Sequence, residues 1–174
     1  IAVINGTAFV HGGLSPLVAD YGLDGVNTTL QSELAAYVRA IGTLIEAEVL
    51  LPTDSHYDYL DIVSAYRPSI NDTPEVLAAL DTVKKLDDAS LIGSDGPLWY
   101  RANVACNGVI EEYRLNATLA AIGAERVVVG HTPTPTRQIL QRFDGHLIEV
   151  DTGMLNFYYK GSGNALVLVG DDVL

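Results

Sequence analysis

The sequence is poor in the features that define several common classes of protein. It has one cysteine, Cys106, in 174 residues, so an internal disulfide framework is excluded. No run of about 18 apolar residues occurs, and we therefore expect no membrane span. Its 10 lysines and arginines stand against 22 acidic residues, which gives a net charge of −12. A chain this acidic repels nucleic acid and anionic lipid, so we expect neither as a partner.

The chain nevertheless has enough apolar material to form one folded domain. Hydrophobic residues make up 48% of the sequence, which is typical of a globular domain with a buried core. We therefore expect a soluble protein, either cytoplasmic or periplasmic. The first residue is Ile1 rather than methionine, and the apolar stretch that follows lacks the charged lead-in of a signal peptide. We interpret this start as a truncation that hides any targeting sequence.

Turn residues and hydrophobic periodicity predict an α/β protein. Asn5-Gly6 tolerates the positive φ angles of a type I′ turn, so the flanking segments 2–4 and 7–10 are expected to form a β-hairpin. Much later in the chain, Arg-Val-Val-Val at residues 126–129 predicts a buried strand. Further strands are expected near residues 138–141, 146–150 and 165–169.

Three helices are expected between the hairpin and the later strands. Apolar residues recur at helical spacing from Thr28 or Thr29, either of which is an expected N-cap, and this helix should end before Pro52. Residues 53–72 mix Tyr, Asp, His, Ser and Pro, which predicts an irregular surface segment. The two later helices are expected at residues 74–83, after Thr73 as N-cap, and at residues 109–122, before Gly123.

Two histidines follow apolar strands and are flanked by glycine. His11 comes before Gly12-Gly13, and His131 comes directly after Gly130. Because glycine has no Cβ, the chain turns sharply there and a ligand approaches the backbone closely. Neutral imidazole is a common ligand of divalent metals, so two such loops at adjacent strand ends are able to converge on one ion. The alternative is a hydrogen-bonded loop histidine, and this is our interpretation of His56 and His146.

Two other segments carry charged residues next to turns. In residues 95–101, turn residues precede Trp99-Tyr100 and then Arg101, whose guanidinium fork suits phosphate oxygens. A surface salt bridge is the alternative role of Arg101. Asp151 follows the strand expected at 146–150, and it either accepts the free ring N–H of a metal-bound histidine or caps its own turn.

Four segments together resemble the calcineurin-like metallophosphoesterases, in their bacterial phosphoprotein-phosphatase-type branch. Phe-Val-His-Gly-Gly-Leu-Ser-Pro at residues 9–16 resembles the histidine-glycine-glycine motif of this superfamily. Gly-Pro-Leu-Trp-Tyr-Arg at residues 96–101 resembles the arginine segment of the branch. Val-Gly-His-Thr-Pro-Thr-Pro at residues 129–135 is similar to the last histidine motif, and residues 150–154 are similar to the strand end that follows it. The segments occur in the family's order and span nearly the whole chain.

The resemblance implies a fold, a site and a reaction. The family fold is a β-sandwich flanked by helices, with the site at the carboxyl ends of strands. By resemblance, His11 and His131 would bind the second of two divalent metal ions, which are Mn, Fe or Zn, and Arg101 would bind the substrate phosphate. The reaction is hydrolysis of a phosphomonoester, on a small molecule or a phosphoprotein, by a hydroxide shared between two ions about 3.5–4 Å apart. The residues that would shape the site without binding metal are Gly12, Gly13, Gly130 and Asp151.

Three further motifs of the family are absent from the sequence. They are an Asp-x-His after a glycine, a Gly-Asp-x-x-Asp-Arg-Gly and a Gly-Asn-His-Glu, which supply the first metal's ligands, the bridging Asp, an Asn ligand and the catalytic His. We therefore interpret residues 1–174 as the C-terminal portion of one metallophosphoesterase domain, with a helical and loop insertion at about residues 26–90. No catalytic residue is expected here beyond the two metal ligands, and the missing N-terminal half is an expected partner.

Three hypotheses of function follow. The first is a metallophosphatase that is active only together with its N-terminal half. The second is a noncatalytic relative of these enzymes that serves as a binding or assembly module. The third is an unrelated metal-binding or acyl-hydrolase domain that mimics the motifs. Ser15 is followed by Pro16 and lacks the nucleophile-elbow context of an acyl hydrolase, which argues against the acyl-hydrolase form of the third hypothesis.

Overall fold

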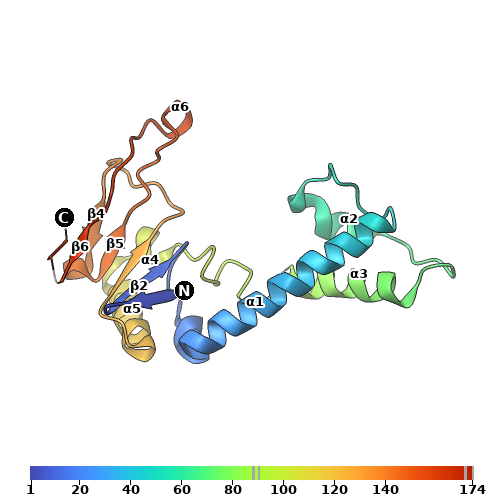
Figure 1. The fold of residues 1–174 in the computed structure, drawn as a ribbon, viewed down its shortest axis with the longest axis horizontal. Coiled ribbons are helices and arrows are strands. Elements are labelled where there is room, and N and C mark those ends of the chain that lie inside the picture. The colour runs from blue at the N-terminus through green and yellow to red at the C-terminus, as the bar shows by residue number, and fades with distance from the viewer. Residues whose placement is uncertain (88, 90, 171, 174) are drawn as a thin grey trace. The chain divides into compact units, whose positions relative to one another are not determined.

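The structure is a computed structural model that describes residues 1–87, 89, 91–170 and 172–173. Its contacts divide the chain into two compact units, residues 1–27 with 94–174 and residues 28–93. Helix α1 (Pro16–Glu46) contributes to both units. Figure 1 shows the elements of each unit. The second unit covers nearly the same residues as the predicted insertion, and its place within a phosphoesterase domain stays a prediction.

The first unit is built around a mixed sheet with the order β1-β2-β3-β5-β4. The three central strands run parallel, and the two outer strands are antiparallel to their neighbours. The carboxyl ends of the central strands therefore lie at one edge of the sheet. Helices flank this sheet, which confirms the α/β fold class. The strands are β1 (Ala2–Ile4), β2 (Thr7–Val10), β3 (Arg126–Val129), β4 (Leu140–Arg142) and β5 (Leu147–Glu149).

Local sequence explains the first hairpin and the central strand. Asn5 and Gly6 have φ angles of 50° and 74°, as a type I′ turn requires, and they join β1 to β2 as predicted. Strand β3 lies between β2 and β5 in the middle of the sheet. Val127, Val128 and Val129 are all buried there, which is why this strand has a continuous apolar sequence.

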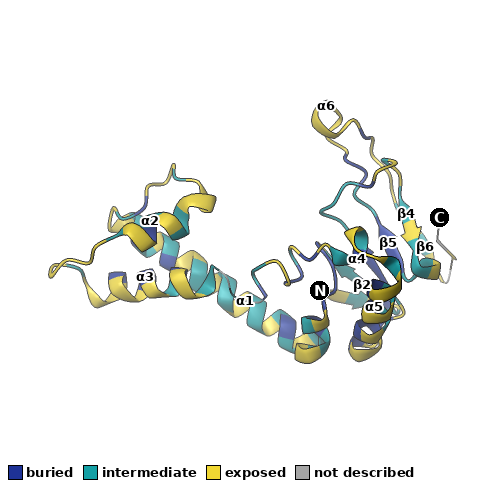
Figure 2. Ribbon diagram, turned by 180° about the vertical axis from the view of Figure 1, so that it is seen from behind, coloured by how far each residue is buried: buried dark blue, intermediate teal, exposed yellow. Residues whose placement is uncertain are grey.

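Two helices lie beside the sheet in both ribbon views (Figures 1 and 2). Helix α4 (Ala102–Ala105) is a single turn, whereas α5 (Gly108–Ile122) confirms the third predicted helix. Leu115 and Leu119 on α5 are buried, so one face of the helix belongs to the core. The helix ends at Gly123, whose φ of 69° is the left-handed conformation that favours glycine.

The strands expected near residues 138–141 and 146–150 are present as β4 and β5, with slightly different bounds. The strand expected at 165–169 is shorter than predicted, because only its last two residues form β6. Strand β6 pairs with β7 in a separate two-stranded sheet. The remaining elements of this unit are η2 (Phe143–Gly145), α6 (Asn156–Tyr159), β6 (Leu168–Val169) and β7 (Asp172–Val173).

The second unit is a small helical bundle. It contains the later part of α1 together with η1 (His56–Asp58), α2 (Tyr59–Ala65) and α3 (Pro74–Leu86). The side chain of Thr73 accepts a hydrogen bond from the backbone N–H of Val76, which confirms the predicted N-cap. No helix in the described part of the chain is long and apolar enough to span a bilayer. The buried core of the bundle consists of Ala40, Leu44, Leu50, Val63, Val76, Ala79, Leu80 and Val83.

The predicted start of the first long helix is wrong. Helix α1 begins at Pro16, twelve or more residues before the expected N-cap at Thr28 or Thr29. The intervening sequence is rich in Gly, Asp and Asn, which disfavour helix in isolation. Tertiary packing outweighs this preference, because Val18 and Val26 are fully buried. Gly22, with φ 68° and ψ 169°, is the point where the helical geometry is interrupted.

The prediction that residues 53–72 are irregular is also wrong for half of this segment, which forms η1 and α2. Val63 on α2 is buried, and Tyr59, Ile62 and Tyr66 pack against the same core. These residues recur every three to four positions, so the segment has an amphipathic pattern despite its polar composition. Such a short helix is stabilised by its packing rather than by intrinsic propensity.

Candidate functional site

The loops singled out in the sequence meet at the carboxyl edge of the sheet. His11 directly follows β2, Gly130-His131 follows β3, and Asp151 lies two residues beyond β5. His11 Nε2 lies 2.8 Å from His131 Nδ1, although 120 residues separate the two histidines. Arg101 Nη2 lies 2.6 Å from His131 Nε2. The structure therefore brings together His11, Arg101 and His131.

These contacts determine where the protons lie. Arginine has hydrogen-bond donors and no acceptor, so Arg101 donates and His131 Nε2 accepts. A neutral His131 then carries its proton on Nδ1 and donates it to His11 Nε2. The three side chains form a directed chain of hydrogen bonds from Arg101 through His131 to His11.

The surroundings of His131 favour its neutral form. Partial burial lowers the pKa of His131 below its ordinary value, and the charges of Arg101 and His11 lower it further. Asp151 acts in the opposite direction and is the smallest of these influences. A neutral imidazole keeps the lone pair that metal binding requires.

The indole ring of Trp99 lies beside His131 and Arg101. Its ring meets the His131 ring edge to face, with centroids 5.0 Å apart and an interplanar angle of 88°. The guanidinium carbon of Arg101 lies 5.5 Å from the Trp99 ring centroid, within the range of a cation–π contact. Trp99 therefore restricts the positions available to both Arg101 and His131.

Gly12 and Gly13 are required by the close approach of two backbone segments. A Cβ on Gly12 would lie 2.7 Å from the carbonyl oxygen of Leu98, and one on Gly13 would lie 2.8 Å from that of Tyr100. The N–H of Gly12 also donates to the carbonyl oxygen of Pro97 at 2.8 Å. The loop that carries His11 is thereby fixed against the segment that carries Arg101.

Gly130 has a different role from Gly12. A Cβ at Gly130 would lie 3.5 Å from the carbonyl oxygen of His11, which is ordinary contact, so space does not require glycine there. Its N–H donates to that same oxygen at 2.9 Å and links the two histidine loops. The unusual backbone belongs to His131, whose φ of 65° is rare for a side-chain-bearing residue.

Asp151 caps its own turn, which is one of the two roles considered for it. Its Oδ1 accepts the N–H of Gly153 at 2.9 Å, and its carbonyl oxygen accepts the N–H of Thr134 at 2.8 Å. The second of these bonds ties the loop after β5 to the loop after β3. The other role, orienting a metal-bound histidine, stays a prediction.

Two nitrogen ligands are available for a metal at this site. His11 Nε2 and His131 Nδ1 are 2.8 Å apart, close enough for both to bind one ion at the usual metal–nitrogen distance of about 2.0–2.1 Å once the Nδ1 proton of His131 is displaced. In the part of the chain that the structure describes, no group of three or more His, Cys, Asp or Glu side chains is arranged to hold a metal. The histidine pair thus fits as a part of a metal site that needs further ligands.

The other two histidines lie in different surroundings, as expected. His56 is exposed and its ring packs on Tyr57, with centroids 3.8 Å apart. His146 Nδ1 lies 2.7 Å from Asn116 Oδ1. Neither interaction involves the residues around His11.

Sequence reasoning missed two buried polar residues beneath the site, Asn103 and Glu111. Asn103 is 0% exposed and Glu111 is 1% exposed. Asn103 has no local sequence signal that distinguishes it. Glu111 has one, because it lies in the same helical register as the buried residues Leu115, Thr118 and Ile122. A carboxylate on this buried face of the helix indicates that hydrogen-bond donors are buried beside it, because burial of an unpaired charge is costly.

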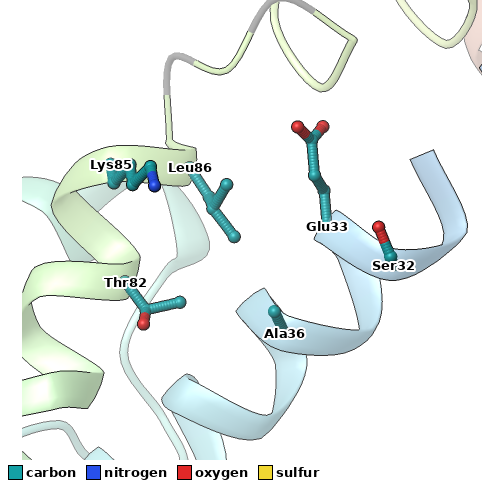
Figure 3. Close-up of a pocket in the computed structure, with 6 residues that line it drawn as sticks. All are labelled: Ser32, Glu33, Ala36, Thr82, Lys85 and Leu86. Atoms are coloured by element: carbon teal, nitrogen blue, oxygen red, sulfur yellow. The ribbon is translucent and has the colours of Figure 1, made fainter. Parts of the chain in front are cut away.

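A separate hollow of about 330 Å³ lies in the helical unit, between α1 and α3 (Figure 3). Its hydroxyl groups are already used, since Ser32 donates to the Thr29 carbonyl and Thr82 donates to the Ala78 carbonyl. Its remaining polar groups are the side chains of Glu33 and Lys85. The hollow offers neither histidine nor arginine, so it does not resemble the group around His131.

We expect Gly12→Ala to destabilise the protein by about 1–3 kcal/mol, the usual cost of forcing extra atoms into a packed interior. The added methyl group meets backbone atoms of Leu98 and Trp99, which cannot rotate away. Gly42→Ala is a matched control, because nothing lies within 4 Å of its Cβ position in α1, and alanine there should stabilise by about 0.5–1 kcal/mol. Chemical denaturation of both variants measures the difference. Equal stability of Gly12→Ala and wild type would contradict the described backbone contact.

Comparisons with known proteins leave the family undetermined. No protein-family model matches the chain, and no curated protein matches it. Among solved structures, a cold-active protein tyrosine phosphatase is similar, with 22% sequence identity and a TM-score of 0.46. The similarity covers 97% of this chain and 36% of that one, so this chain spans about a third of the phosphatase's length. At this TM-score the likeness establishes neither a shared fold nor a shared activity.

Proposed function

We propose that this chain is the C-terminal portion of a metal-dependent phosphatase that hydrolyses phosphomonoesters, on small molecules or phosphoproteins. The observation that carries the proposal is the direct contact of Arg101 with the His11–His131 pair, at 2.6 and 2.8 Å. A fixed cation beside two imidazole rings combines a phosphate-binding group with ligands for a divalent metal. These three residues come from the segments that resemble metallophosphoesterase motifs.

Arg101 would bind the phosphoryl group of the substrate. Its planar guanidinium has five N–H donors in a rigid fork, which matches two phosphate oxygens at once. The residue is exposed, so a phosphate can reach it from solvent. Contacts with Trp99 and His131 limit its rotation, which lowers the entropy lost when phosphate binds.

His11 and His131 would bind a divalent ion such as Mn, Fe or Zn. The ion, together with a second one, supplies charge neutralisation and a reactive hydroxide when bound. Binding through His131 Nδ1 would displace the proton that this nitrogen donates to His11 in the structure. The remaining ligands would come from a segment outside these 174 residues, since the described part of the chain places no carboxylate or third histidine with the pair.

The presence of only two metal ligands among the described residues also supports the alternative function, a noncatalytic binding or assembly module. Two histidines and an arginine are enough to bind a phosphorylated partner without hydrolysing it. The two functions differ in whether further metal ligands join the pair in the intact protein.

Hydrolysis of p-nitrophenyl phosphate with added Mn distinguishes these possibilities. We expect the 174-residue chain alone to bind Mn weakly and to show no turnover, because two ligands without a bridging carboxylate do not hold two ions. A longer natural protein that contains this chain and the missing motifs should show Mn-dependent turnover. Strong Mn-dependent turnover by the 174-residue chain would overturn the need for further ligands, and an inactive longer protein would favour the binding module.

A further inference from the structure

A buried carboxylate lies beneath the site and holds the two segments that flank it. Glu111 Oε2 accepts a hydrogen bond from the hydroxyl of Tyr100 at 2.9 Å and a longer one from Asn103 Nδ2 at 3.5 Å. Glu111 Oε1 accepts from Arg114 at 2.9 Å on the outer side of the helix. The burial of Tyr100 and its bond to Glu111 both raise the tyrosine pKa, so the hydroxyl stays protonated and donates.

Tyr100 and Asn103 lie on either side of Arg101 in the sequence. The carboxylate of Glu111 therefore holds the chain before and after the arginine, and the arginine itself points to His131. Because the chain is held both before and after Arg101, the backbone position from which its side chain extends is fixed more strictly than a single contact would fix it. This arrangement sets the place from which the guanidinium reaches His131.

Asn103 extends the same network to the other side of the site. Its Oδ1 accepts the backbone N–H of Leu14 at 2.8 Å, three residues after His11. This bond fixes the orientation of the amide, because a backbone N–H only donates and so the Nδ2 group must face Glu111. The Oδ1 atom also fills the space where a Cβ of Gly13 would lie, at 2.7 Å.

We propose that Glu111 is the positioning residue that sets the geometry of Arg101 relative to His11 and His131. It acts through Tyr100 and Asn103 and touches neither substrate nor metal. The buried carboxylate of Glu111 accepts three hydrogen bonds, from Tyr100, Asn103 and Arg114. Hydrogen bonds to a charged group are strong when each of its partners is present. The proposal rests on the phosphate-binding role proposed for Arg101, and it predicts that loss of the carboxylate displaces Arg101 and the His11 loop together.

The test uses the 174-residue chain, inorganic phosphate as probe, and the ring-nitrogen NMR shifts of His11 and His131. In Glu111→Ala we expect phosphate affinity to fall at least about tenfold, because hydrogen bonds to a charged group are worth at least that factor. The His131 nitrogen shifts should also change as its bond to Arg101 is lost. Glu111→Gln should restore both, since one amide oxygen can accept from Tyr100 and Asn103.

Arg114→Gln is the matched control, because it removes the outer partner of Glu111 and leaves the inner contacts. Arg114 has a side chain that is 51% exposed, and its loss should change neither phosphate affinity nor the histidine shifts. If Glu111→Ala fails to fold, Tyr100→Phe removes a single inner hydrogen bond and should shift the histidine signals and weaken phosphate binding severalfold.

Two results separate this proposal from the proposed function. Unchanged histidine shifts in a folded Glu111→Ala, or in Tyr100→Phe where the alanine variant is unfolded, would overturn the positioning role. Wild-type protein that binds no phosphate would remove the phosphate role of Arg101, while the histidine shifts of the variants would still decide whether Glu111 positions the site.

Discussion

In the metal-dependent phosphatase proposed here, replacement of His11 or His131 by alanine should lower turnover more than about 100-fold, since loss of a hydrogen-bonding partner of a metal ligand already costs about 10–100-fold. Each variant removes one of the two nitrogens that lie 2.8 Å apart. We expect bound metal to fall in parallel. Elemental analysis of the purified variants measures this directly.

His56→Ala is the control for these two substitutions. His56 is exposed and contacts Tyr57, in a segment of the helical unit. Its loss should leave both metal content and turnover nearly unchanged. Full metal occupancy and normal turnover in both His11→Ala and His131→Ala would rule out their assignment as ligands, and the pair would then be a hydrogen-bonded feature of the loops.

The second large effect is expected for Arg101, which should act on substrate without changing metal content. Arg101→Ala should reduce turnover by about 3–4 kcal/mol in transition-state stabilisation, by analogy with other fixed donors that meet developing negative charge. Arg101→Lys keeps the charge and loses the fork, so a substantial loss is expected here too. Inhibition by free phosphate should weaken in both variants, because the product presents the same oxygens.

Steady-state kinetics and metal analysis of the same samples distinguish this role from a structural one. A fall in turnover with metals retained indicates an interaction made with the substrate. Unchanged catalysis and phosphate inhibition, together with lower thermal stability, would instead show that Arg101 serves to fix His131 and Trp99, its two partners in the structure.

The sequence predicted those parts of the fold whose signals are local. Asn5-Gly6 predicted the hairpin through its backbone preferences, and Gly123 marked the end of α5. It did not predict the strand order β1-β2-β3-β5-β4, because the pairing of β2 with β3 depends on contacts between residues more than a hundred positions apart. It also misplaced the start of α1, where burial of Val18 and Val26 outweighs weak helical propensity.

For the candidate site, the sequence singled out three residues that the structure brings together, but it did not single out the buried residues beneath them. His11, Arg101 and His131 stood out through glycine, aromatic and strand contexts and through the family resemblance. The contact between His11 and His131 follows from the parallel pairing of β2 with β3. Asn103 was unpredictable because its partner is the backbone N–H of Leu14, and any residue other than proline has such a group.

The sequence separation of 120 positions between His11 and His131 has a consequence for how the protein folds. Contacts of such high sequence separation form slowly, because the entropy of closing a long loop is lost before the contacts can compensate for it. The helical unit, residues 28–93, lies within that loop and is built from neighbouring segments, so it can form early and independently. The edge that carries the histidines becomes complete only when β3 joins β2. We therefore expect the helical unit to form before the histidine pair.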